Sequence, residues 1–307
     1  MQDTQTVTFP GMAKDEGFVM LPDRSITKGK RLTKEDVSPE SWARYEKLLK
    51  DNHISGEPVI YLDVKDKSTK ASVSLGTLVD GRQPTVLVIN DAEHEWTPEY
   101  VRRQAPAKSD LDASVKAHAF ADGRTGSRGE KKYYAEFEEA LRIMGGDPAT
   151  EVYFNKAKVT GPHSPVVSAM TQEGTPYVVL NEPDLKKLHW NAAQFENVAG
   201  HEVAHNNAGD NKPDNVARVH NDRTHTLSRA QEQRADDKTV DTMQNPAAFA
   251  EALQIGMNLD IKAYKKETGK TEQDYYNESQ TLDPLHNPVK ERIDTLNKKA
   301  ASLSKPR

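Results

Sequence analysis

The segment NAAQFENVAGHEVAHNN, residues 191–207, has the pattern of a helix that carries two histidines on one face. Asn191 is a favourable residue for the start of a helix. Phe195, Ala199 and Val203 recur at helical spacing. Histidines four residues apart on a helix differ by about 40° in direction and about 6 Å along the axis, so they project from one side. The segment therefore predicts a helix with an apolar face and two neighbouring imidazoles.

His201 and His205 have the spacing of two ligands of one metal ion, and Glu202 follows the first of them. In an H-E-x-x-H helix the histidines bind zinc, and the glutamate can take a proton from a water at the open coordination position. The alternative is an ordinary polar helix face, because three fixed residues arise by chance in about one chain per hundred of this length. The motif alone therefore indicates a zinc site that further ligands must support.

A third ligand is expected on a second helix. The stretch SRAQEQRADDKTVDTM, residues 228–243, reads as a helix that contains Glu232, with Asp236 one turn later on the same face. Catalytic zinc sites have three protein ligands, and Glu232 is the candidate for the third. Asp236 is suited to a hydrogen bond with a ligating histidine. Glu–Asp pairs with this spacing are also common on solvated helices, so the pair supports the site only together with the histidines.

Composition limits the chemistry of the site. The chain of 307 residues contains no cysteine, which excludes disulfides and cysteine-ligated metals. A transition metal must therefore rely on His, Asp and Glu. The net charge of −5 argues against a nucleic-acid-binding protein. No apolar run approaches the ~18 residues that span a bilayer, and the first residues lack the features of a signal peptide, so we expect a cytoplasmic protein unless it is exported without a leader or after its removal.

Hydrophobic periodicity predicts a mixed α and β chain. We expect amphipathic helices at 38–52 and 133–146 and strands at 57–64, 84–90, 150–159, 164–170 and 175–181. Residues 1–40 are polar and contain several Pro and Gly residues, so we expect a flexible N-terminal arm there. The remaining chain is expected to divide into a module at 41–130 and a metal-binding domain at 131–307.

An internal repeat supports this division. Residues 42–63 lie without a gap on residues 134–155, at an offset of 92, the difference between positions 134 and 42. In this alignment Tyr61 meets Tyr153. The alternative is that two helix–strand units look alike because they share hydrophobic periodicity. A true repeat requires the same strand order in both segments, and a different order would exclude it.

The first copy lacks most of the metal motif. The stretch VKAHAFAD, residues 115–122, resembles VAGHEVAH, but Ala119 and Asp122 stand where the second copy has Glu202 and His205. A ligand set reduced to one histidine does not hold zinc tightly, because affinity needs several deprotonated ligands in a fixed geometry. The first copy is therefore expected to be a degenerate module that packs or binds substrate without a catalytic metal.

Four motifs in the second half occur in the order of a known family. They are HEVAH (201–205), EQRAD (232–236), NPAAFAEALQIG (245–256) and DPLHNPVKERIDTL (283–296). Over about residues 134–300 the chain resembles the HtpX-like and CAAX-prenyl-protease zinc metallopeptidases, which are gluzincins. The resemblance implies an α+β fold whose active-site helices pack on a small mixed sheet. It also implies one Zn²⁺ per chain bound by His201, His205 and Glu232, with Glu202 as the general base.

The same resemblance assigns supporting residues. Asp236 matches the aspartate of the E-x-x-x-D motif, and His286 and Arg292 match a His-Pro-x-x-x-Arg element. The family pattern implies that His286 approaches the active site, where it is the candidate for oxyanion stabilisation, and that Arg292 supports the site. Asn287 interrupts this element, which puts the role of His286 in question. The family carries membrane helices and this sequence has no such run, so it resembles the compact minigluzincins, and a prenyl-protease substrate is in doubt.

The predicted function is a zinc-dependent endopeptidase that acts on a peptide or protein substrate. The segment PVVSAMTQEGTPYVV, residues 165–179, is expected either to present an edge strand to substrate or to be an ordinary sheet strand. One alternative is a non-catalytic, zinc-stabilised binding or scaffold module, and another is an exported peptidase effector or toxin with one protein target. Glu202 favours the enzyme, because a structural zinc site does not need a base. The sequence does not indicate the oligomeric state.

Overall fold

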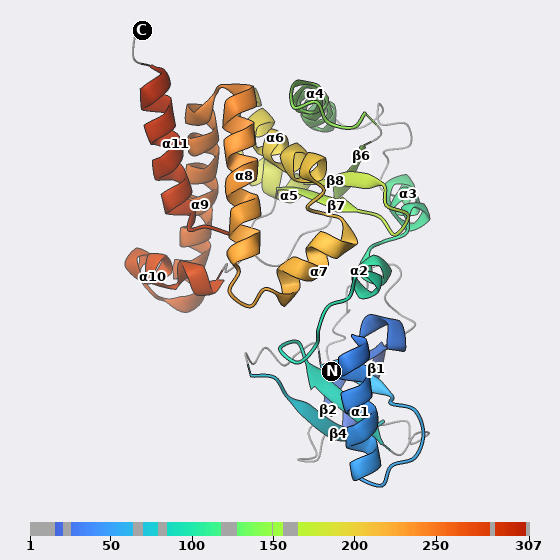
Figure 1. The fold of residues 1–307 in the computed structure, drawn as a ribbon. Helices are drawn as coiled ribbons and strands as arrows, with labels where there is room; N and C mark the ends of the chain where they lie inside the picture. Colours follow the sequence, from blue (N-terminus) through green and yellow to red (C-terminus); the bar gives the residue numbers. More distant parts are fainter. Residues whose placement is uncertain are drawn as a thin grey trace, which may run out of the picture. The chain divides into compact units, whose positions relative to one another are not determined.

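The computed structural model describes residues 16–20, 26–63, 70–78, 85–117, 128–148, 150–155, 165–282 and 286–304. Helices and strands are mixed along the chain, so the predicted α+β class is confirmed (Figure 1). The chain divides into two compact units, one comprising residues 1–106 with 216–221 and the other residues 107–215 with 222–307. The main division therefore falls after residue 106 rather than after the predicted residue 130.

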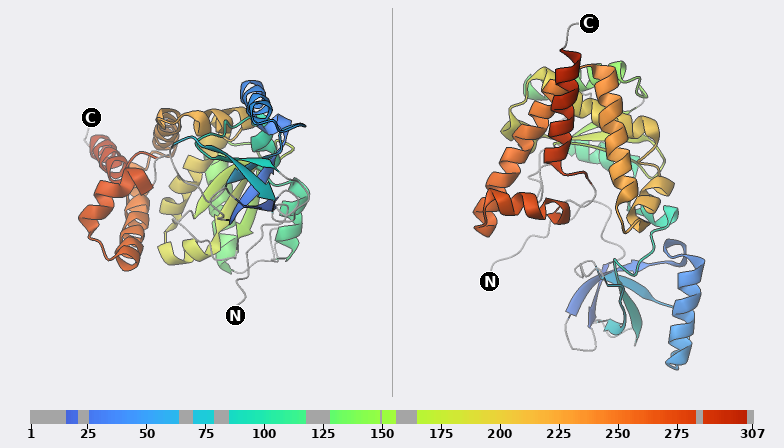
Figure 2. Two further views of the ribbon diagram at one scale, coloured as in Figure 1. Left: turned by 90° about the horizontal axis from the view of Figure 1, so that it is seen from below. Right: turned by 60° about the vertical axis from the view of Figure 1, so that its left-hand side comes forward.

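The first unit is a closed five-stranded barrel with a helix beside it (Figure 2). The strands follow the order β1-β2-β3-β5-β4, and β1 pairs with β4 to close the barrel. Neighbouring strands are antiparallel except for β3 and β5, which are parallel. The elements are β1 (Glu16–Met20), β2 (Ile26–Leu32), a 3-10 turn η1 (Lys34–Asp36), α1 (Pro39–Asp51), β3 (Ile60–Asp63), β4 (Val73–Leu78), β5 (Val86–Asn90) and α2 (Pro98–Gln104).

Helix α1 forms where the sequence predicted it. The hydroxyl of Ser38 accepts the hydrogen bond of the Ser41 N–H, which satisfies one of the free donors at the helix start. Trp42, Tyr45 and Leu49 are buried, as their helical spacing requires. These side chains belong to the core of the barrel unit, so burial of this face holds the helix on the sheet.

The predicted flexible arm over residues 1–40 is wrong for the parts of it that the structure describes. Residues 16–20 and 26–32 form β1 and β2, and β2 pairs with β3 from Gly29 opposite Asp63 to Leu32 opposite Ile60. Polar composition concealed these strands because pairing uses the main chain, which every residue type supplies. A Cβ at position 29 would lie 2.9 Å from the Cβ of Tyr61, so glycine there permits the close approach of β2 and β3.

The second unit contains a three-stranded sheet in the order β6-β8-β7. Strands β6 and β8 are parallel, whereas β7 and β8 are antiparallel. Helices α9 and α11 lie side by side (Figure 1). The elements are α3 (Lys108–Ala117), α4 (Arg128–Ile143), β6 (Glu151–Asn155), β7 (Val166–Met170), β8 (Pro176–Asn181), α5 (Glu182–Leu188), α6 (Ala192–Ala208), α7 (Pro213–Asn221), α8 (Thr226–Met243), α9 (Pro246–Thr268), α10 (Glu272–Leu282) and α11 (Val289–Leu303).

The core of the second unit positions α6. Phe137 of α4, Leu180 of β8 and Phe195 of α6 are fully buried in one apolar cluster. Two glycines follow α4, and a Cβ at Gly146 would lie only 2.8 Å from Cγ1 of Val203 on α6. Glycine at this position therefore allows the end of α4 to pack tightly against the histidine-bearing helix.

The strand order that the internal repeat requires is present. The order β3-β5-β4 in the first unit matches β6-β8-β7 in the second, with the same parallel and antiparallel pairs. Tyr61 lies opposite Val88, and Tyr153 lies opposite Val179 at the corresponding place. A common origin of the two segments stays a prediction, and residues 118–122 of the expected degenerate motif lie outside the described residues.

The membrane helices of the resembling family have no counterpart in the described part of the chain. Helices such as α9 are long, but none of the described helices combines the length and the apolar composition that a bilayer span requires. The long helices of the second unit instead carry polar residues on their outer faces, such as Lys262 and Lys265 of α9.

Candidate metal centre

Helix α6 is capped at both ends, which defines where it begins and ends. The side chain of Asn191 accepts the N–H of Gln194 at 3.0 Å, and the Gln194 side chain accepts the N–H of Asn191 at 3.0 Å. This reciprocal capping confirms the predicted helix start. The helix ends at Gly209, whose φ of 73° is the left-handed conformation that glycine adopts without strain. Both histidines are buried on the side that faces α8.

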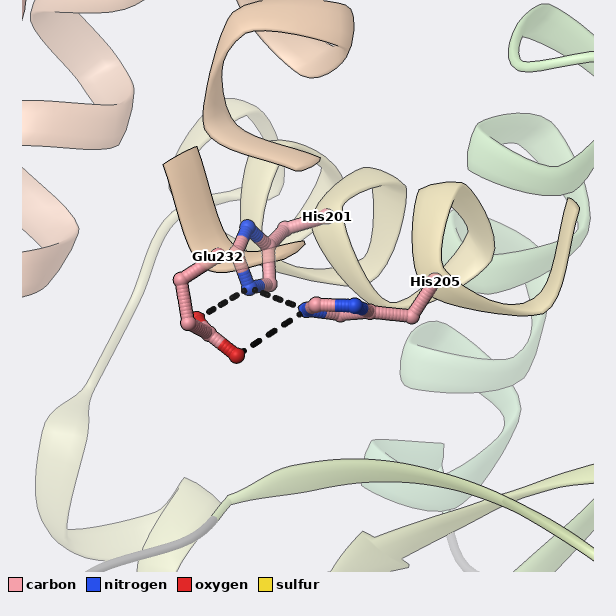
Figure 3. Close-up of side chains that lie close together, drawn as sticks. All are labelled: His201, His205 and Glu232. Carbon is pink, nitrogen blue, oxygen red and sulfur yellow. Dashed lines mark hydrogen bonds and ion pairs between the residues drawn. The ribbon is translucent and has the colours of Figure 1, made fainter. Parts of the chain in front are cut away.

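Three side chains from two helices converge on one point (Figure 3). His201 and His205 come from α6, and Glu232 comes from α8, as the sequence predicted. The two Nε2 atoms are 3.0 Å apart. Nε2 of His201 and Nε2 of His205 each lie 3.2 Å from a different carboxylate oxygen of Glu232.

These separations fit the donor atoms of a single ion. Ligand atoms at about 2.0–2.1 Å from a tetrahedral zinc stand about 3.3 Å apart. The observed separations of 3.0–3.2 Å between the two nitrogens, and between each nitrogen and one oxygen of Glu232, are close to this value. All three residues offer atoms within 4.8 Å of one another, so the group can hold a metal ion. A tetrahedral ion held by these three residues would have one further position for a water or a substrate.

The outer ring nitrogen of His201 is held by a buried ion pair. Its Nδ1 lies 2.9 Å from Oδ1 of Asp236. The guanidinium of Arg292 donates to both oxygens of Asp236, at 2.8 and 2.7 Å, and lies 3.8 Å from Glu232. Asp236 and Arg292 are both buried. The structure thus brings together the supporting residues that the sequence singled out, with Nε2 of His201 at the centre and its Nδ1 beside Asp236.

His205 has an equivalent partner that the sequence reasoning missed. Its Nδ1 lies 2.9 Å from Oδ2 of Asp210, which follows the glycine at the end of α6. Both histidines of the donor group, His201 and His205, therefore have the outer nitrogen beside a carboxylate oxygen. An acid directly after the glycine that ends the helix is a weak signal in the sequence, because its direction depends on the conformation of the turn.

His286 lies at the centre but is less enclosed than the ligands. Its Nε2 is 3.5 Å from Oε1 of Glu232, and 40% of its side chain is exposed. The additional residue Asn287 donates its side-chain amide to the carbonyl of Arg229 at 3.4 Å. The insertion therefore does not remove His286 from the site, although a role in oxyanion stabilisation stays a prediction.

Glu202 is fixed by the sheet rather than by its own helix. The N–H and the hydroxyl of Ser168 on β7 both donate to Oε2 of Glu202, at 2.9 and 2.6 Å. The side-chain amide of Asn211 donates to the Ser168 hydroxyl at 3.0 Å. These contacts tie the expected base to β7 through one of its carboxylate oxygens. The sequence reasoning identified the strand but missed Ser168 and Asn211, because neither lies in a recognisable motif.

Alternate residues of β7 direct their main-chain groups away from β8, on the side where Ser168 meets Glu202. The N–H of Asn181 donates to the carbonyl of Pro165, and Val167 lies opposite Val179 in the next paired position. In an antiparallel ladder the intervening residues direct their N–H and C=O groups away from the partner strand. The N–H of Ser168 accordingly points away from β8, where it meets Glu202.

The charges of the site are consistent with metal ligation. Burial lowers the pKa of both histidines, but hydrogen bonds to carboxylates outweigh it, and they raise the pKa of His205 to about 10 through Asp210 and Glu232. The pKa of His201 is raised in the same way by Asp236 and Glu232. Burial opposes ionisation of Glu232, yet the two histidines hold its pKa well below the usual range. A cation is thus favoured at this position, and a metal ion competes with the protons for the same nitrogens.

Comparison with known proteins does not assign a family. No protein-family model matches the chain, and no curated protein or solved structure matches it. The geometry of the centre is therefore the basis on which a function can be assigned. Its components are the donor group of His201, His205 and Glu232, the carboxylates behind both histidines, and the carboxylate of Glu202 beside β7.

Proposed function

We propose that this protein is a zinc-dependent peptidase of the gluzincin type. The observation that carries the proposal is the position of Glu202, which follows a metal-binding histidine on α6 and is held by the main chain of β7. A metal that served only to stabilise the fold would not need an oriented carboxylate beside its open position. The resemblance of the motifs to gluzincins supports the same conclusion.

The donor set favours zinc. Two imidazole nitrogens and one carboxylate, with a fourth position left open, form the ligand set of catalytic zinc hydrolases. Non-haem iron enzymes also use two histidines and one carboxylate. Glu202 favours the zinc hydrolase over the iron enzyme, because hydrolysis requires a base beside the open coordination position. Elemental analysis distinguishes these two metals.

The side chains of the site provide the proton transfers of peptide hydrolysis. When bound, zinc polarises a carbonyl and lowers the pKa of a water to about 7. Glu202, with Oε2 fixed by Ser168, accepts a proton from the attacking water through its other oxygen and then transfers that proton to the leaving nitrogen. His286 lies beside Glu232 and 40% of its side chain is exposed, so a bound substrate can reach it and its imidazole can donate a hydrogen bond to the oxyanion.

Strand β7 is the proposed binding surface for the substrate main chain. Within the described residues β7 pairs only with β8. Its Val166 and Met170 direct their main-chain groups away from β8, as Ser168 does. An extended peptide can add to this edge through main-chain hydrogen bonds. The side chain of Val167 is 38% exposed beside this edge and offers an apolar contact.

A digest of a peptide library by the zinc-loaded protein tests the proposal. We expect hydrolysis that stops when a chelator removes zinc and resumes when zinc is restored. The matched control is Glu202→Gln, which retains the shape and the Ser168 contacts but cannot accept a proton. We expect its turnover to fall by about 10²- to 10⁴-fold with zinc still bound.

Two results would contradict the proposal. Hydrolysis by Glu202→Gln at the wild-type rate would remove Glu202 as the base. A wild-type protein that binds zinc but cleaves no peptide in a broad library would favour the scaffold alternative, in which the metal only stabilises the fold.

A further inference from the structure

The turn that ends α6 places the side chain of Asp210 back against the helix, beside His205. Gly209 has a φ of 73°, and its N–H donates to the carbonyl of Asn206 at 3.0 Å. The next N–H, that of Asp210, donates to the carbonyl of His205 at 3.0 Å. A residue with a side chain is strained at this φ, so glycine sets the path that brings Asp210 back to His205.

Asp210 contacts both helices of the centre, α6 and α8. Its Oδ2 lies 2.9 Å from Nδ1 of His205, and its Oδ1 accepts a hydrogen bond from Nη2 of Arg234. Arg234 lies on α8, two positions after the ligand Glu232. Asp210 is only 8% exposed, so the carboxylate is withdrawn from solvent although it lies in a turn. Helix α8 thus supplies both a ligand and the group that fixes the support of another ligand.

We infer that Asp210, fixed by Arg234, is the positioning residue for His205 in metal binding. By accepting the Nδ1–H, Asp210 selects the tautomer in which the lone pair of Nε2 faces the metal. The inference rests on the proposed metal site and assigns its second supporting pair. The chain His205–Asp210–Arg234 repeats the arrangement of His201, Asp236 and Arg292.

The position of Asp210 speaks against a purely structural role. A helix C-terminus carries partial negative charge, so a carboxylate placed there is unfavourable unless a cation or donor compensates it. The turn itself is formed by main-chain hydrogen bonds and by Gly209, and the Asp210 side chain takes no part in them. The carboxylate therefore serves the histidine it contacts rather than the turn that carries it.

The two supporting pairs differ in exposure, and this predicts unequal effects. The side chain of Arg292 is 8% exposed, whereas that of Arg234 is 52% exposed. Solvent screens an exposed ion pair more strongly than a buried one. Loss of the exposed Arg234 is therefore expected to weaken zinc binding less than loss of the buried Arg292. It should also weaken binding less than loss of Asp210, because the His205–Asp210 contact remains buried without Arg234.

Zinc affinity measured by chelator competition on the full-length protein tests the inference. We expect Asp210→Ala to weaken zinc binding by about 10- to 100-fold. Asp210→Asn keeps an oxygen that can accept from Nδ1–H and should lose less. The control is Asp214→Asn, an exposed acid at the start of α7 that takes no part in the centre, and its affinity should stay at the wild-type value.

A second readout separates positioning from folding. Cobalt bound in place of zinc reports ligand geometry in its visible absorption, and we expect Asp210→Ala to shift this spectrum while Asp210→Asn restores it in part. Wild-type affinity and spectrum in Asp210→Ala would overturn the inference. A wild-type protein that binds neither metal would instead refute the proposed metal site. If Asp210→Ala does not fold, Asp210→Asn with the wild-type spectrum and an affinity equal to that of Asp214→Asn would also overturn the inference.

Discussion

The two units contain the same helix–strand arrangement, but the strands β4 and β7, which occupy the same place in it, have different neighbours. In the first unit β4 pairs with β5 on one side and with β1 on the other, which closes the barrel. In the second unit the corresponding strand, β7, pairs with β8 and lies beside α6. A strand whose main-chain groups are used on both sides has none left for a substrate or a catalytic residue. Within the described residues β7 pairs only with β8, so the proposed site has main-chain groups available at this edge.

The residues at matching positions show the same contrast. Leu75 lies opposite Leu87 in the first unit and packs against the apolar core. The matching position in β7 is Ser168, opposite Val178, where the hydroxyl and N–H hold Glu202. One strand position therefore stabilises the barrel in the first unit and orients the proposed base in the second.

The largest expected effect concerns the buried arginine of the second unit. Arg292→Met leaves Asp236 buried without its guanidinium partner, and we expect the free energy of unfolding to fall by about 3–5 kcal/mol. Arg103 pairs with the fully buried Asp36 of the first unit but is 36% exposed, and Asp36 also accepts bonds from Thr33. Arg103→Met should therefore cost less. Urea denaturation measures both, and equal losses would contradict the distinction.

The next effect concerns closure of the barrel. Val19 in β1 is paired with Thr27 on one side and Leu78 on the other. Val19→Pro removes the N–H donor and is expected to lower the free energy of unfolding of the first unit by about 2 kcal/mol. Zinc content should not change, because the candidate metal centre lies in the second unit. Loss of zinc in this variant would show that the barrel is needed to form the centre.

A smaller effect is expected at the contact between β7 and the base. Ser168→Ala removes one of the two donors to Glu202, and we expect kcat to fall about tenfold, equivalent to about 1.4 kcal/mol, with KM little changed. The control is Ser74→Ala on β4 of the first unit, which should retain full turnover. Ser168→Thr keeps the hydroxyl and should recover activity. A change confined to KM would mean that Ser168 binds substrate rather than orienting Glu202.

The smallest effect compares two helix positions separated by the repeat offset of 92. Glu136 on α4 has a buried oxygen that meets no hydrogen-bond donor in the described part of the chain, and burial raises its pKa. A carboxyl group whose pKa is higher in the folded state favours folding below its unfolded-state pKa. This contribution is lost as the pH rises through its folded-state pKa. Glu136→Gln should thus stabilise the protein by about 1 kcal/mol at pH 8 and not at pH 4.

The matching residue of the first unit provides the control for this pH effect. Arg44 occupies the corresponding position on α1, and 56% of its side chain is exposed. Arg44→Gln should change the free energy of unfolding by no more than about 0.5 kcal/mol at either pH. Thermal unfolding measures the change in the free energy of unfolding for each of the two variants at each of the two pH values. A stabilisation by Glu136→Gln that is equal at pH 4 and pH 8 would rule out burial of the charge as its cause.

Local periodicity predicted the centre of the site because helix geometry is nearly independent of context. The step of four residues placed His201 and His205 together, and the same step on α8 placed Asp236 behind Glu232. What the sequence could not supply was the direction of side chains in turns and across the sheet. Asp210 and Ser168 reach the centre only through the Gly209 turn and the packing of β7 beside α6.

The strands of the first unit were harder to predict for a different reason. β2 has the sequence ITKGKRL, in which polar residues dominate, and it pairs with β1 just before it and with β3 more than twenty-five residues later. Hydrophobic periodicity detects a strand only when one face is buried in a regular alternation. The repeat was visible because α1 and β3 keep their buried positions, including Tyr45 and Tyr61.

The zinc content of the full-length protein tests the central claim most directly, because only the second unit should hold a metal. Elemental analysis should find about one zinc per chain in the wild type and none above background in His201→Ala, since three ligands are needed for tight binding. Two zinc ions per chain would show that the first unit also carries a site. One zinc retained in His201→Ala would place the metal elsewhere and contradict the account.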